Sequence, residues 1–365
     1  MSFENPFTPS FGEIPVHVAG RRQIIDSMTR AFESTRRRPE LTTIISGARG
    51  MGKTTLLALM ARKAESLGWI SVSATALPGM LEDIEIGTRR AARHLLSEEP
   101  AAHVTGVSIA SLGGISLEHQ GDRPTNWRYR MADILDRLAE TETGLLITVD
   151  EIDPGLDEMI QLAAVYQHYV QEGRKVALMM AGLPNRVSAL LSNRTVSFLR
   201  RAQSVRLDPV SPYDVKRALN STVLEGGREI TQEALDYATD EAGGFPFLIQ
   251  LIGYHSWDVR PNEPVIELSD VELGAGFAQD EMRDRIFEAT YRDLSEGDIR
   301  FLSAMLEDEG DSKVIDLGRR LERSSSLIAQ YRRRLIDAGV IGGRQRGVIG
   351  FDLPHFREYL EERLS

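Results

Sequence analysis

The sequence predicts an α/β protein in which a parallel sheet is followed by a helical region and then by three helices and a β-hairpin. Three observations support this prediction. Short apolar runs alternate with amphipathic stretches up to about residue 207, and only helical periodicity appears between about residues 211 and 292. The order of elements then changes again after residue 293. Alternating strands and helices of this length are typical of βαβ units, whose strands run parallel.

The first 19 residues contain three prolines and few periodic apolar positions, which predicts an extended arm. Residues 20–209 then hold apolar runs with the length of buried strands. The predicted strands are Leu41–Ile45, Trp69–Val72, Leu145–Val149, Lys175–Met180 and Ser204–Leu207. The predicted helices are Gly52–Ser66, Met80–Leu96, Trp127–Glu140, Leu156–Glu172 and Pro184–Ser192. This alternation predicts a doubly wound parallel sheet with helices on both faces.

One segment inside this region departs from the alternation of strands and helices. Val104–Glu118 alternates polar and apolar residues with period two around Gly113-Gly114. Such alternation around paired glycines is typical of a β-hairpin. We therefore expect a hairpin inserted before the strand that ends at Asp150.

The rest of the chain is expected to form two further domains. Residues 210–292 show only helical periodicity, which predicts a helical lid domain. Residues 293–365 contain a longer series of elements. The predicted order is helix Glu296–Leu306, helix Val314–Leu321, helix Ser324–Ala338, two short strands around Gly342–Gly347 and helix Leu353–Leu364. Three helices followed by a hairpin is the order of a winged helix-turn-helix.

The composition limits the classes of function. A formal net charge of −11 argues against a protein that coats nucleic acid, because most of the surface would repel a phosphate polymer. The sequence contains no cysteine, and its seven histidines show no metal-ligand spacing, so we expect neither disulfides nor a zinc site. We find no secretory leader and no apolar stretch near the roughly 20 residues of a membrane helix. We expect a cytoplasmic protein without membrane contact.

A phosphate-binding motif lies between the first predicted strand and its helix. Residues 47–54 match G-x-x-x-x-G-K-T, the P-loop. Its glycines let backbone N–H groups face the β-phosphate, Lys53 reaches the β- and γ-phosphates, and the Thr54 hydroxyl binds Mg²⁺. The expected nucleotide-binding residues are Gly47, Ala48, Arg49, Gly50, Met51, Gly52, Lys53, Thr54 and Thr55.

Two carboxylates end the third predicted strand. The sequence GLLITVDEID places Asp150 and Glu151 directly after an apolar run. A carboxylate at this strand end can bind Mg²⁺ together with Thr54, and the next one can activate a water for attack on the γ-phosphate. We therefore assign Asp150 to the metal and Glu151 to the general base. A kinase would not need Glu151, so the pair favours hydrolysis over transfer to a small molecule.

Two further positions are candidates for acting on the γ-phosphate. Asn185 follows the strand expected beside the Asp150 strand and can sense the phosphate through a water, although Pro184-Asn185 is equally a helix start. Arg200 and Arg201 precede the last strand. An arginine neutralises transition-state charge in cis or from a neighbouring subunit. We expect Arg201 to serve, in oligomers if it acts in trans, and the alternative is a solvated basic pair.

Together these residues resemble the AAA+ superfamily, in the branch that joins origin-recognition-type initiator ATPases to STAND signalling ATPases. The resemblance implies ATP and Mg²⁺ as ligands. Arg21, in Ala19-Gly20-Arg21, resembles the "GR" that opens the first helix near adenine. Gly244-Phe245-Pro246 resembles the STAND G-x-P signature, whose proline, here Pro246, packs near the base. Initiators usually carry a sensing arginine in the lid, but Phe247–Trp257 has none. The AGLP segment and the arginine after it also resemble transposition- and secretion-associated AAA+ ATPases.

The third helix of the predicted winged unit has two different faces. Leu327, Ile328, Tyr331 and Leu335 are expected to pack inward, with Arg334 nearer that side. The candidate DNA-contacting residues lie on the opposite face, on its flank and at the hairpin tip: Ser326, Gln330, Arg332, Arg333, Arg344 and Arg346. Residues 319–346 hold eight arginines against two acidic residues, which gives DNA binding an electrostatic basis.

Two classes of function remain open at this stage. The first is a DNA-associated ATPase of initiator, transposition or mobile-element type, which binds ATP or ADP and contacts double-stranded DNA. The second is a STAND-like switch whose winged helix contacts protein and whose output is oligomer assembly. A small-molecule kinase leaves the winged helix unexplained and is disfavoured.

Overall fold

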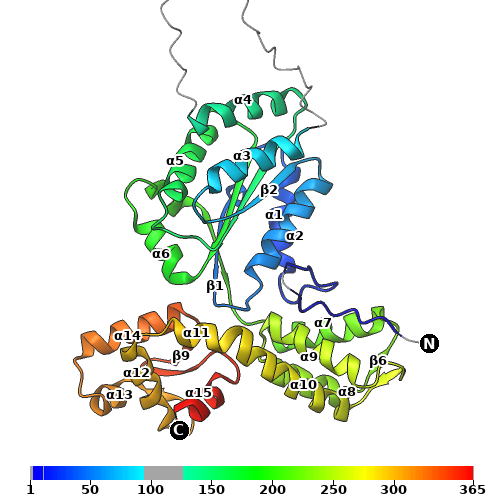
Figure 1. Cartoon of the computed structure of the whole chain (residues 1–365), viewed down its shortest axis with the longest axis vertical. Coiled ribbons are helices and arrows are strands. Elements are labelled where there is room, and N and C mark those ends of the chain that lie inside the picture. Colours follow the sequence, from blue (N-terminus) through cyan, green and yellow to red (C-terminus); the bar gives the residue numbers. More distant parts are fainter. Residues whose placement is uncertain (1–2, 11, 94–125, 365) are drawn as a thin grey trace, which may run out of the picture.

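The structure, a computed structural model, describes residues 3–10, 12–93 and 126–364. The hairpin expected at Val104–Glu118 lies outside the described residues. Figure 1 shows a sheet with its helices at the top, a helical region below it on the right and the C-terminal helices and strands below it on the left. No helix in the described ranges is both long enough and apolar enough to cross a membrane.

The upper part is built on a five-stranded parallel sheet, as the alternating pattern predicted. The strands are β1 (Thr42–Gly47), β2 (Ile70–Thr75), β3 (Leu145–Asp150), β4 (Val176–Gly182) and β5 (Gln203–Leu207), in the spatial order β2-β3-β4-β1-β5. Only β4 lies between β1 and β3. The loop after β1 and the carboxylates after β3 therefore lie near each other at the carboxyl edge of the sheet.

Helices cover both faces of this sheet. They are α1 (Arg22–Glu33), α2 (Lys53–Ser66), α3 (Met80–Ala91), α4 (Trp127–Glu140), α5 (Asp157–Gln171) and α6 (Pro184–Ser192). Residues of α1 and α2 pack with Ile45 and Leu146 on one face, whereas residues of α3 to α6 pack with Ile44 and Ile147 on the other. Neighbouring residues of one strand thus serve opposite faces, which is why the central strands β3 and β4 are apolar along most of their length.

The lid (residues 210–292) is mainly helical. It contains α7 (Pro212–Glu225), α8 (Gln232–Ala242), α9 (Pro246–Val259) and α10 (Leu268–Met282). Two short strands that the helical periodicity did not predict, β6 (Glu229–Ile230) and β7 (Val265–Ile266), pair in parallel. The helix of α10 continues through a π-helical turn, Arg283–Phe287, into α11 (Glu288–Arg292). One continuous helical segment therefore joins the lid to the C-terminal unit (Figure 1).

The C-terminal unit (residues 293–364) has the element order of a winged helix-turn-helix. Its elements are α12 (Glu296–Leu306), β8 (Ser312–Lys313), α13 (Val314–Arg320), α14 (Ser325–Asp337), β9 (Ile341–Gln345), β10 (Val348–Phe351) and α15 (Phe356–Leu364). The predicted hairpin is β9–β10, and the two-residue strand β8, which the sequence did not predict, pairs with β10.

The arm (residues 1–19) contains no helix or strand in its described part and packs on the lid. Phe7 is only 3% exposed, and it lies so close to α9 that a Cβ added to Gly253 would be 2.2 Å from its ring. Asn5 Nδ2 donates to the Tyr254 carbonyl at 3.0 Å and to the Asp258 carboxylate at 2.9 Å. These contacts hold the arm beside the opening between lid and sheet.

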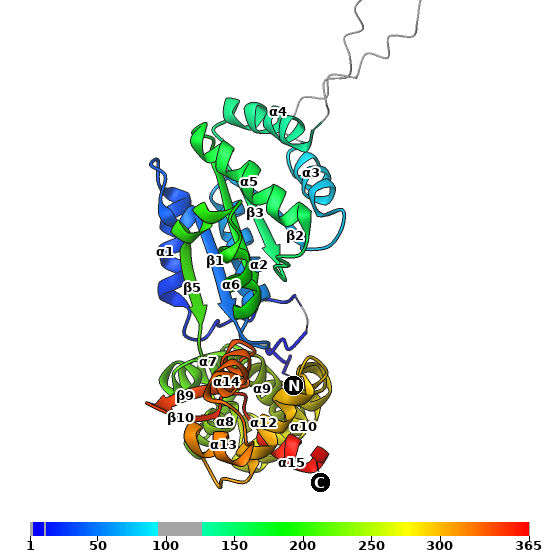
Figure 2. The same cartoon turned by 90° about the vertical axis from the view of Figure 1, so that its left-hand side faces the viewer.

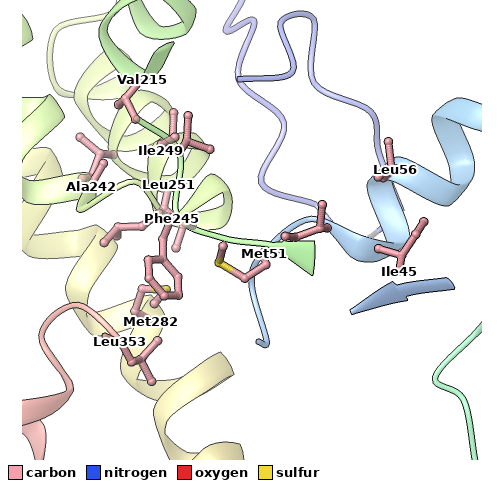
Figure 3. Packing of buried hydrophobic residues seen from close by; sticks show 14 of the residues in the cluster. Ile45, Met51, Leu56, Val215, Ala242, Phe245, Ile249, Leu251, Met282 and Leu353 are labelled. Atoms are coloured by element: carbon pink, nitrogen blue, oxygen red, sulfur yellow. The ribbon is translucent and has the colours of Figure 1, made fainter. Parts of the chain in front are cut away.

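An apolar cluster connects the sheet to the lid through the glycine-rich loop. Met51, only 2% exposed, lies between Ile45 and Leu56 of the sheet layer and Phe245 of the lid (Figure 3). Burial of a methionine side chain stabilises such a junction by about 1.5–3 kcal/mol. The glycine-rich loop is thus connected covalently to the sheet domain and is also held to the lid by apolar packing.

The C-terminal unit also contacts the sheet domain directly. Helix α14 packs against α6, and Figures 1 and 2 both place α14 beneath the sheet domain. Gly339, just after α14, has a φ of +72°, and a Cβ added there would be 2.0 Å from the Cβ of Ala48. Only a glycine allows this approach, so the end of α14 is fitted to the glycine-rich loop.

Candidate nucleotide-binding site

The glycine-rich loop joins the carboxyl end of β1 to the amino end of α2. Gly50 and Gly52 have φ angles of +76° and +80°, in the left-handed region that favours glycine. They allow the tight turn between Gly47, which ends β1, and Lys53, which begins α2. A turn of this kind at the amino end of a helix presents backbone N–H groups to an anion.

Lys53 is buried inside this loop, with 7% of its surface exposed. Its Nζ donates to the carbonyl oxygens of Gly47 at 3.0 Å and Ala48 at 2.9 Å. Burial lowers the pKa of Lys53, and the nearby charges of Glu151 and Asp150 oppose that shift. Because an anionic phosphate is a stronger acceptor than a carbonyl, the ammonium group is placed to transfer its hydrogen bonds to a phosphate in the loop.

Asp150 and Glu151 lie opposite this lysine, at the end of β3. The Thr54 hydroxyl donates to Asp150 Oδ2, and Asp150 Oδ1 accepts from the Glu151 N–H at 2.8 Å. The hydroxyl and carboxylate oxygens are hard ligands that suit Mg²⁺, which proteins hold with one or two carboxylates and phosphate oxygens. The residues present therefore fit a magnesium ion bound together with a nucleotide.

Glu151 has an unusual backbone conformation for a residue with a side chain. Its φ is +54°, and its side chain lines the pocket over the loop. A non-glycine residue in this region costs about 1–3 kcal/mol, and such strain concentrates at functional sites. The conformation turns the glutamate out of the strand line toward the phosphate end of the pocket.

A pocket of about 400 Å³ lies over the loop, a volume typical of small-molecule sites. The loop and the start of α2 contribute Arg49, Gly50, Met51, Gly52, Lys53, Thr54, Thr55 and Leu56. The arm and the residues after it contribute Thr8, Pro9, Ser10, Gly12, Glu13, Pro15, His17, Val18, Ala19 and Arg21. The lid and the helix that follows it contribute Pro246, Phe247, Ile249, Gln250, Arg285 and Ile286. Most predicted nucleotide residues thus share one pocket, and Gly47 and Ala48 border it as acceptors for Lys53.

The arm and the lid meet at a polar contact inside this pocket. Gln250 Oε1 accepts from the Thr8 N–H at 3.1 Å, and Gln250 is only 7% exposed. The Thr8 hydroxyl is buried and has no hydrogen-bond partner among the described residues. An orphaned buried hydroxyl is costly, so this end of the pocket offers an unused polar group to a ligand. Neither residue carries a local sequence signal, because the contact forms only when the arm lies on the lid.

Arg21 and Pro246 both lie in the pocket wall. Arg21 is 9% exposed, and its Nη2 donates to the Asp208 carbonyl at 2.8 Å; burial lowers its pKa, and the charge of Asp208 opposes that shift. Pro246 begins α9 and lies against Gly52. The next residue, Phe247, donates its N–H to the Gly50 carbonyl at 3.3 Å. The lid is therefore closed directly onto the glycine-rich loop.

The structure does not bring the other predicted phosphate-acting residues into this pocket. Asn185 is exposed in the first turn of α6, and its Oδ1 accepts from the Arg186 N–H at 2.8 Å. Asn185 therefore does not line the pocket itself, and its role as a γ-phosphate sensor through a water stays a prediction. Arg200 donates to the Leu191 carbonyl, and Arg201 is exposed without a hydrogen-bond or ion-pair partner among the described residues. Neither arginine lines the pocket of its own chain.

The inward and outward faces of α14 are as predicted. Ile328 and Leu335 are buried, Leu327 and Tyr331 are half-buried, and Arg334 pairs with the buried Asp298 at 2.7 Å. The candidate DNA-contacting residues Ser326, Gln330, Arg332, Arg333 and Arg346 are exposed.

Arg344 is different from these residues. It donates to Asp352 at 2.7 Å and to the Phe351 carbonyl, and it lies near Asp311. Its charge is therefore balanced by Asp352 and Asp311, which distinguishes it from the other candidate DNA-contacting arginine at the hairpin tip, Arg346.

A larger cavity, of about 830 Å³, lies at the opposite edge of the sheet. It is lined by residues that precede strands, such as Leu41, Trp69 and Thr143. In open α/β sheets ligands bind at the carboxyl ends of the strands, where the glycine-rich loop lies. The smaller pocket over that loop is therefore the candidate site.

A family comparison agrees with this geometry. Residues 17–179 match the family model described as the AAA ATPase domain. These residues are an AAA+ P-loop ATPase domain. The protein is accordingly an ATP hydrolase, and residues 284–360 match a second model, a domain of unknown function (DUF8462). No curated protein matches the chain.

Solved structures show that the fold of this AAA+ ATPase extends over the whole chain. The ORC2 protein of Aeropyrum pernix, solved as ADPNP–ADP complexes, has a TM-score of 0.64 at 14% identity, covering 99% of this chain and 98% of its own. The Walker-type ATPase PABY2304 of Pyrococcus abyssi has a TM-score of 0.65 at 13% identity, and the match covers 95% of this chain and 99% of the PABY2304 chain. Cdc6p from Pyrobaculum aerophilum has a TM-score of 0.51 at 16% identity, with 98% of both chains covered. The fold is that of the ORC/Cdc6-type AAA+ ATPases.

Proposed function

We propose that this AAA+ ATPase is a Mg²⁺-dependent switch whose nucleotide state controls its C-terminal unit, and that this unit associates with double-stranded DNA. One observation carries the proposal: the C-terminal unit contacts the glycine-rich loop itself. Gly339 lies against Ala48, and Asp293 pairs with Arg49 at 2.6 Å. A nucleotide bound in the loop acts on the same residues that hold the unit in place.

The chemistry proposed for the site uses the residues around the loop. Thr54 and Asp150 would hold Mg²⁺, which would supply charge neutralisation for the phosphates. Lys53 and the loop N–H groups bind the phosphates. Glu151 accepts a proton from a water whose oxygen bonds to the γ-phosphorus while the bond to the β,γ-bridging oxygen breaks, which yields ADP and inorganic phosphate.

The adenine end of the nucleotide is assigned to the arm and lid. Pro246 and Arg21 border this end, and Thr8 and Gln250 offer it polar groups. The hydrogen bonds of Asn5 keep the arm on α9. We propose that the arm closes over the base, so that nucleotide exchange requires the arm to open.

Arg201 is proposed to act on the nucleotide of a neighbouring subunit. It is exposed, and it does not line the pocket of its own chain. An arginine supplied in trans requires an oligomer. A normal rate of hydrolysis by a strictly monomeric, ATP-bound form would exclude this role.

The charge of the C-terminal unit supports a modest DNA contact. Of the eight arginines in residues 319–346, four are balanced by close carboxylates: Arg319, Arg320, Arg334 and Arg344. The other four, Arg323, Arg332, Arg333 and Arg346, have exposed side chains, and Arg333 reaches Asp337 only at 4.0 Å. If each neutralises one phosphate, the logarithm of the affinity falls with the logarithm of salt with a slope of about −3.6.

Fluorescence anisotropy with a labelled duplex at several salt concentrations, with and without ATP, tests this association. We expect a slope no steeper than about −3.6, and loss of binding in Arg333→Ala/Arg346→Ala. Arg344→Ala is a matched control, because it removes an arginine of the same hairpin whose charge is already balanced. Absence of any duplex binding would contradict the DNA association and leave the ATPase assignment intact.

One observation favours a second candidate, a STAND-like switch whose output is assembly with protein. Helix α14 packs against α6 of its own chain, so part of its surface already serves a protein contact. In that case ATP would release the C-terminal unit to bind another subunit. Size-exclusion chromatography with light scattering, in ADP and in a non-hydrolysable ATP analogue, distinguishes the two: assembly without duplex binding supports this candidate.

A further inference from the structure

We infer that Arg285 is the residue through which this chain detects the γ-phosphate of its own nucleotide. The inference rests on the proposed function, because it takes ATP as the ligand of the pocket. Arg285 belongs to the helical segment that leads into the C-terminal unit, and its side chain lines the same pocket as Lys53 and Glu151. Phe247–Trp257, the part of α9 nearest the loop, contains no arginine.

The other cations that line the pocket are already engaged. Arg21 is buried and donates to the Asp208 carbonyl, and Lys53 lies within the loop that it serves. Arg49, which also lines the pocket, is paired with Asp293. Arg285 keeps 52% of its side chain exposed, so it can move toward a ligand without losing a buried contact.

Arg285 is held back by a carboxylate that a phosphate can replace. Its Nη2 pairs with Oε1 of Glu281, one helical turn earlier, and Oε2 of the same glutamate binds His255 Nε2 at 2.9 Å. His255 lies on α9, the helix that begins at the glycine-rich loop. A guanidinium binds phosphate with two parallel hydrogen bonds, and the γ-phosphate carries more charge than one carboxylate. A nucleotide triphosphate is therefore expected to compete with Glu281 for Arg285.

The backbone around Arg285 is also unusual. Residues Arg283–Phe287 form a π-helical turn between α10 and α11. Such turns add a residue to the helix, change which side chains face a neighbour, and occur often at functional sites. In this chain the turn lies at the point where the lid helix becomes the helix that carries Asp293, the partner of Arg49.

These contacts connect the γ-phosphate to the C-terminal unit by a short route. When Arg285 moves from Glu281 to the phosphate, the helix between the lid and α12 shifts with it. Along that helix, Glu288 contacts Tyr359 and Arg363 of α15, and Asp293, just after its end, pairs with Arg49 of the loop. ADP lacks the phosphate that draws Arg285 away. The two nucleotides are therefore distinguished by one side chain on the connecting helix.

The test compares affinities for ADP and for the β,γ-imido analogue of ATP, measured by isothermal titration calorimetry with Mg²⁺ on the full chain. We expect Arg285→Ala to bind the triphosphate about tenfold more weakly or worse, the effect of a charged hydrogen bond, and to bind ADP within about twofold of wild type. Arg285→Lys keeps the positive charge but cannot donate two parallel hydrogen bonds, so it should recover only part of the lost triphosphate affinity. Arg292→Ala is the matched control, because Arg292 is exposed on the same helix and does not line the pocket.

Three results would overturn the inference. One is an unchanged triphosphate affinity in Arg285→Ala, and another is an equal loss for both nucleotides, which would indicate a general change of the pocket. The third is the same loss in Arg292→Ala. Failure of the wild-type protein to bind either nucleotide would instead overturn the proposed function, and with it the ligand on which this inference depends.

Discussion

Arg49 of the glycine-rich loop forms an ion pair with Asp293, the residue that follows α11, with 2.6 Å between Nη2 and Oδ2. The two residues are 244 positions apart in the sequence and come from the nucleotide site and from the start of the C-terminal unit. With Gly339 against Ala48, this pair makes two adjacent loop residues the docking point of that unit. The loop therefore binds its ligand on one side and a domain of its own chain on the other.

Breaking this pair should loosen the C-terminal unit without unfolding the protein. Both side chains are partly exposed, so Asp293→Asn should cost no more than about 1 kcal/mol of stability. Limited proteolysis should nevertheless cut the connection near residues 283–295 faster than in wild type. Arg300→Ala, which removes an exposed pair with Glu296 inside α12, is the control. Equal cleavage rates in both variants would show that the Arg49–Asp293 pair does not hold the unit.

Gly339→Ala should separate the C-terminal unit from the loop. The substitution costs about 1–2 kcal/mol for the positive φ, and its Cβ would also overlap Ala48. Gly347→Ala has the same backbone cost, at a φ of +76°, but meets no atom within 4 Å. We expect both variants to lose stability and only Gly339→Ala to expose the connecting helix in hydrogen exchange. Similar exchange in the two would contradict docking at this point.

Lys53→Ala should abolish ATP binding. The buried lysine donates to the Gly47 and Ala48 carbonyls and can transfer these hydrogen bonds to a phosphate, so the variant removes both the donors and their positive charge. Calorimetric titration with ATP and Mg²⁺ measures the effect. Retained micromolar affinity would show that the nucleotide lies elsewhere.

Glu151→Gln should bind ATP normally and hydrolyse it about 10²–10⁴-fold more slowly, the usual effect of removing a general base. The amide keeps the size of the side chain at a strained backbone position and removes only its basicity. Steady-state release of phosphate is the measurement, and chelation of Mg²⁺ with EDTA should stop turnover in wild type. Near-normal turnover by the variant would assign water activation to another residue.

Thr8→Val should have opposite effects on stability and on binding. The Thr8 hydroxyl is buried without a partner, so its isosteric replacement should raise the free energy of unfolding of the nucleotide-free protein by about 1 kcal/mol. If the Thr8 hydroxyl forms a hydrogen bond with the adenine base, the same variant should bind ATP more weakly. Thermal unfolding with and without ATP gives both values, and an increased stabilisation by ATP would contradict a role in binding.

Much of the fold could be predicted because the relevant signals are local. The five strands and most helices were predicted within a few residues, since apolar runs and helical periodicity depend on neighbours in the chain. The strand β8 and the pair β6–β7 were not, because two-residue strands carry no periodic signal and form only when a distant partner is present.

The residues of the candidate site could likewise be predicted where the signal is local in the sequence, and could not where it depends on tertiary structure. Lys53, Thr54, Asp150 and Glu151 follow from motifs at strand ends, whose chemistry is set by local spacing. The position of Asn185 outside the pocket could not be predicted, because a place after a strand does not fix side-chain direction; the residue is exposed at the helix start. Arg344 was grouped with the candidate DNA-contacting residues, and its balance by Asp352 and Asp311 could be seen only once the hairpin was placed.

The sequence by itself determined the phosphate loop, its acidic partners, the parallel sheet and the order of the C-terminal elements, because each depends on residues close together in the chain. Only the tertiary structure decided that the arm closes the pocket, that Arg285 enters it from the connecting helix, and that Ala48 and Arg49 carry the C-terminal unit. Those relationships join residues more than 200 positions apart. They depend on the packing of whole layers, which no local pattern encodes.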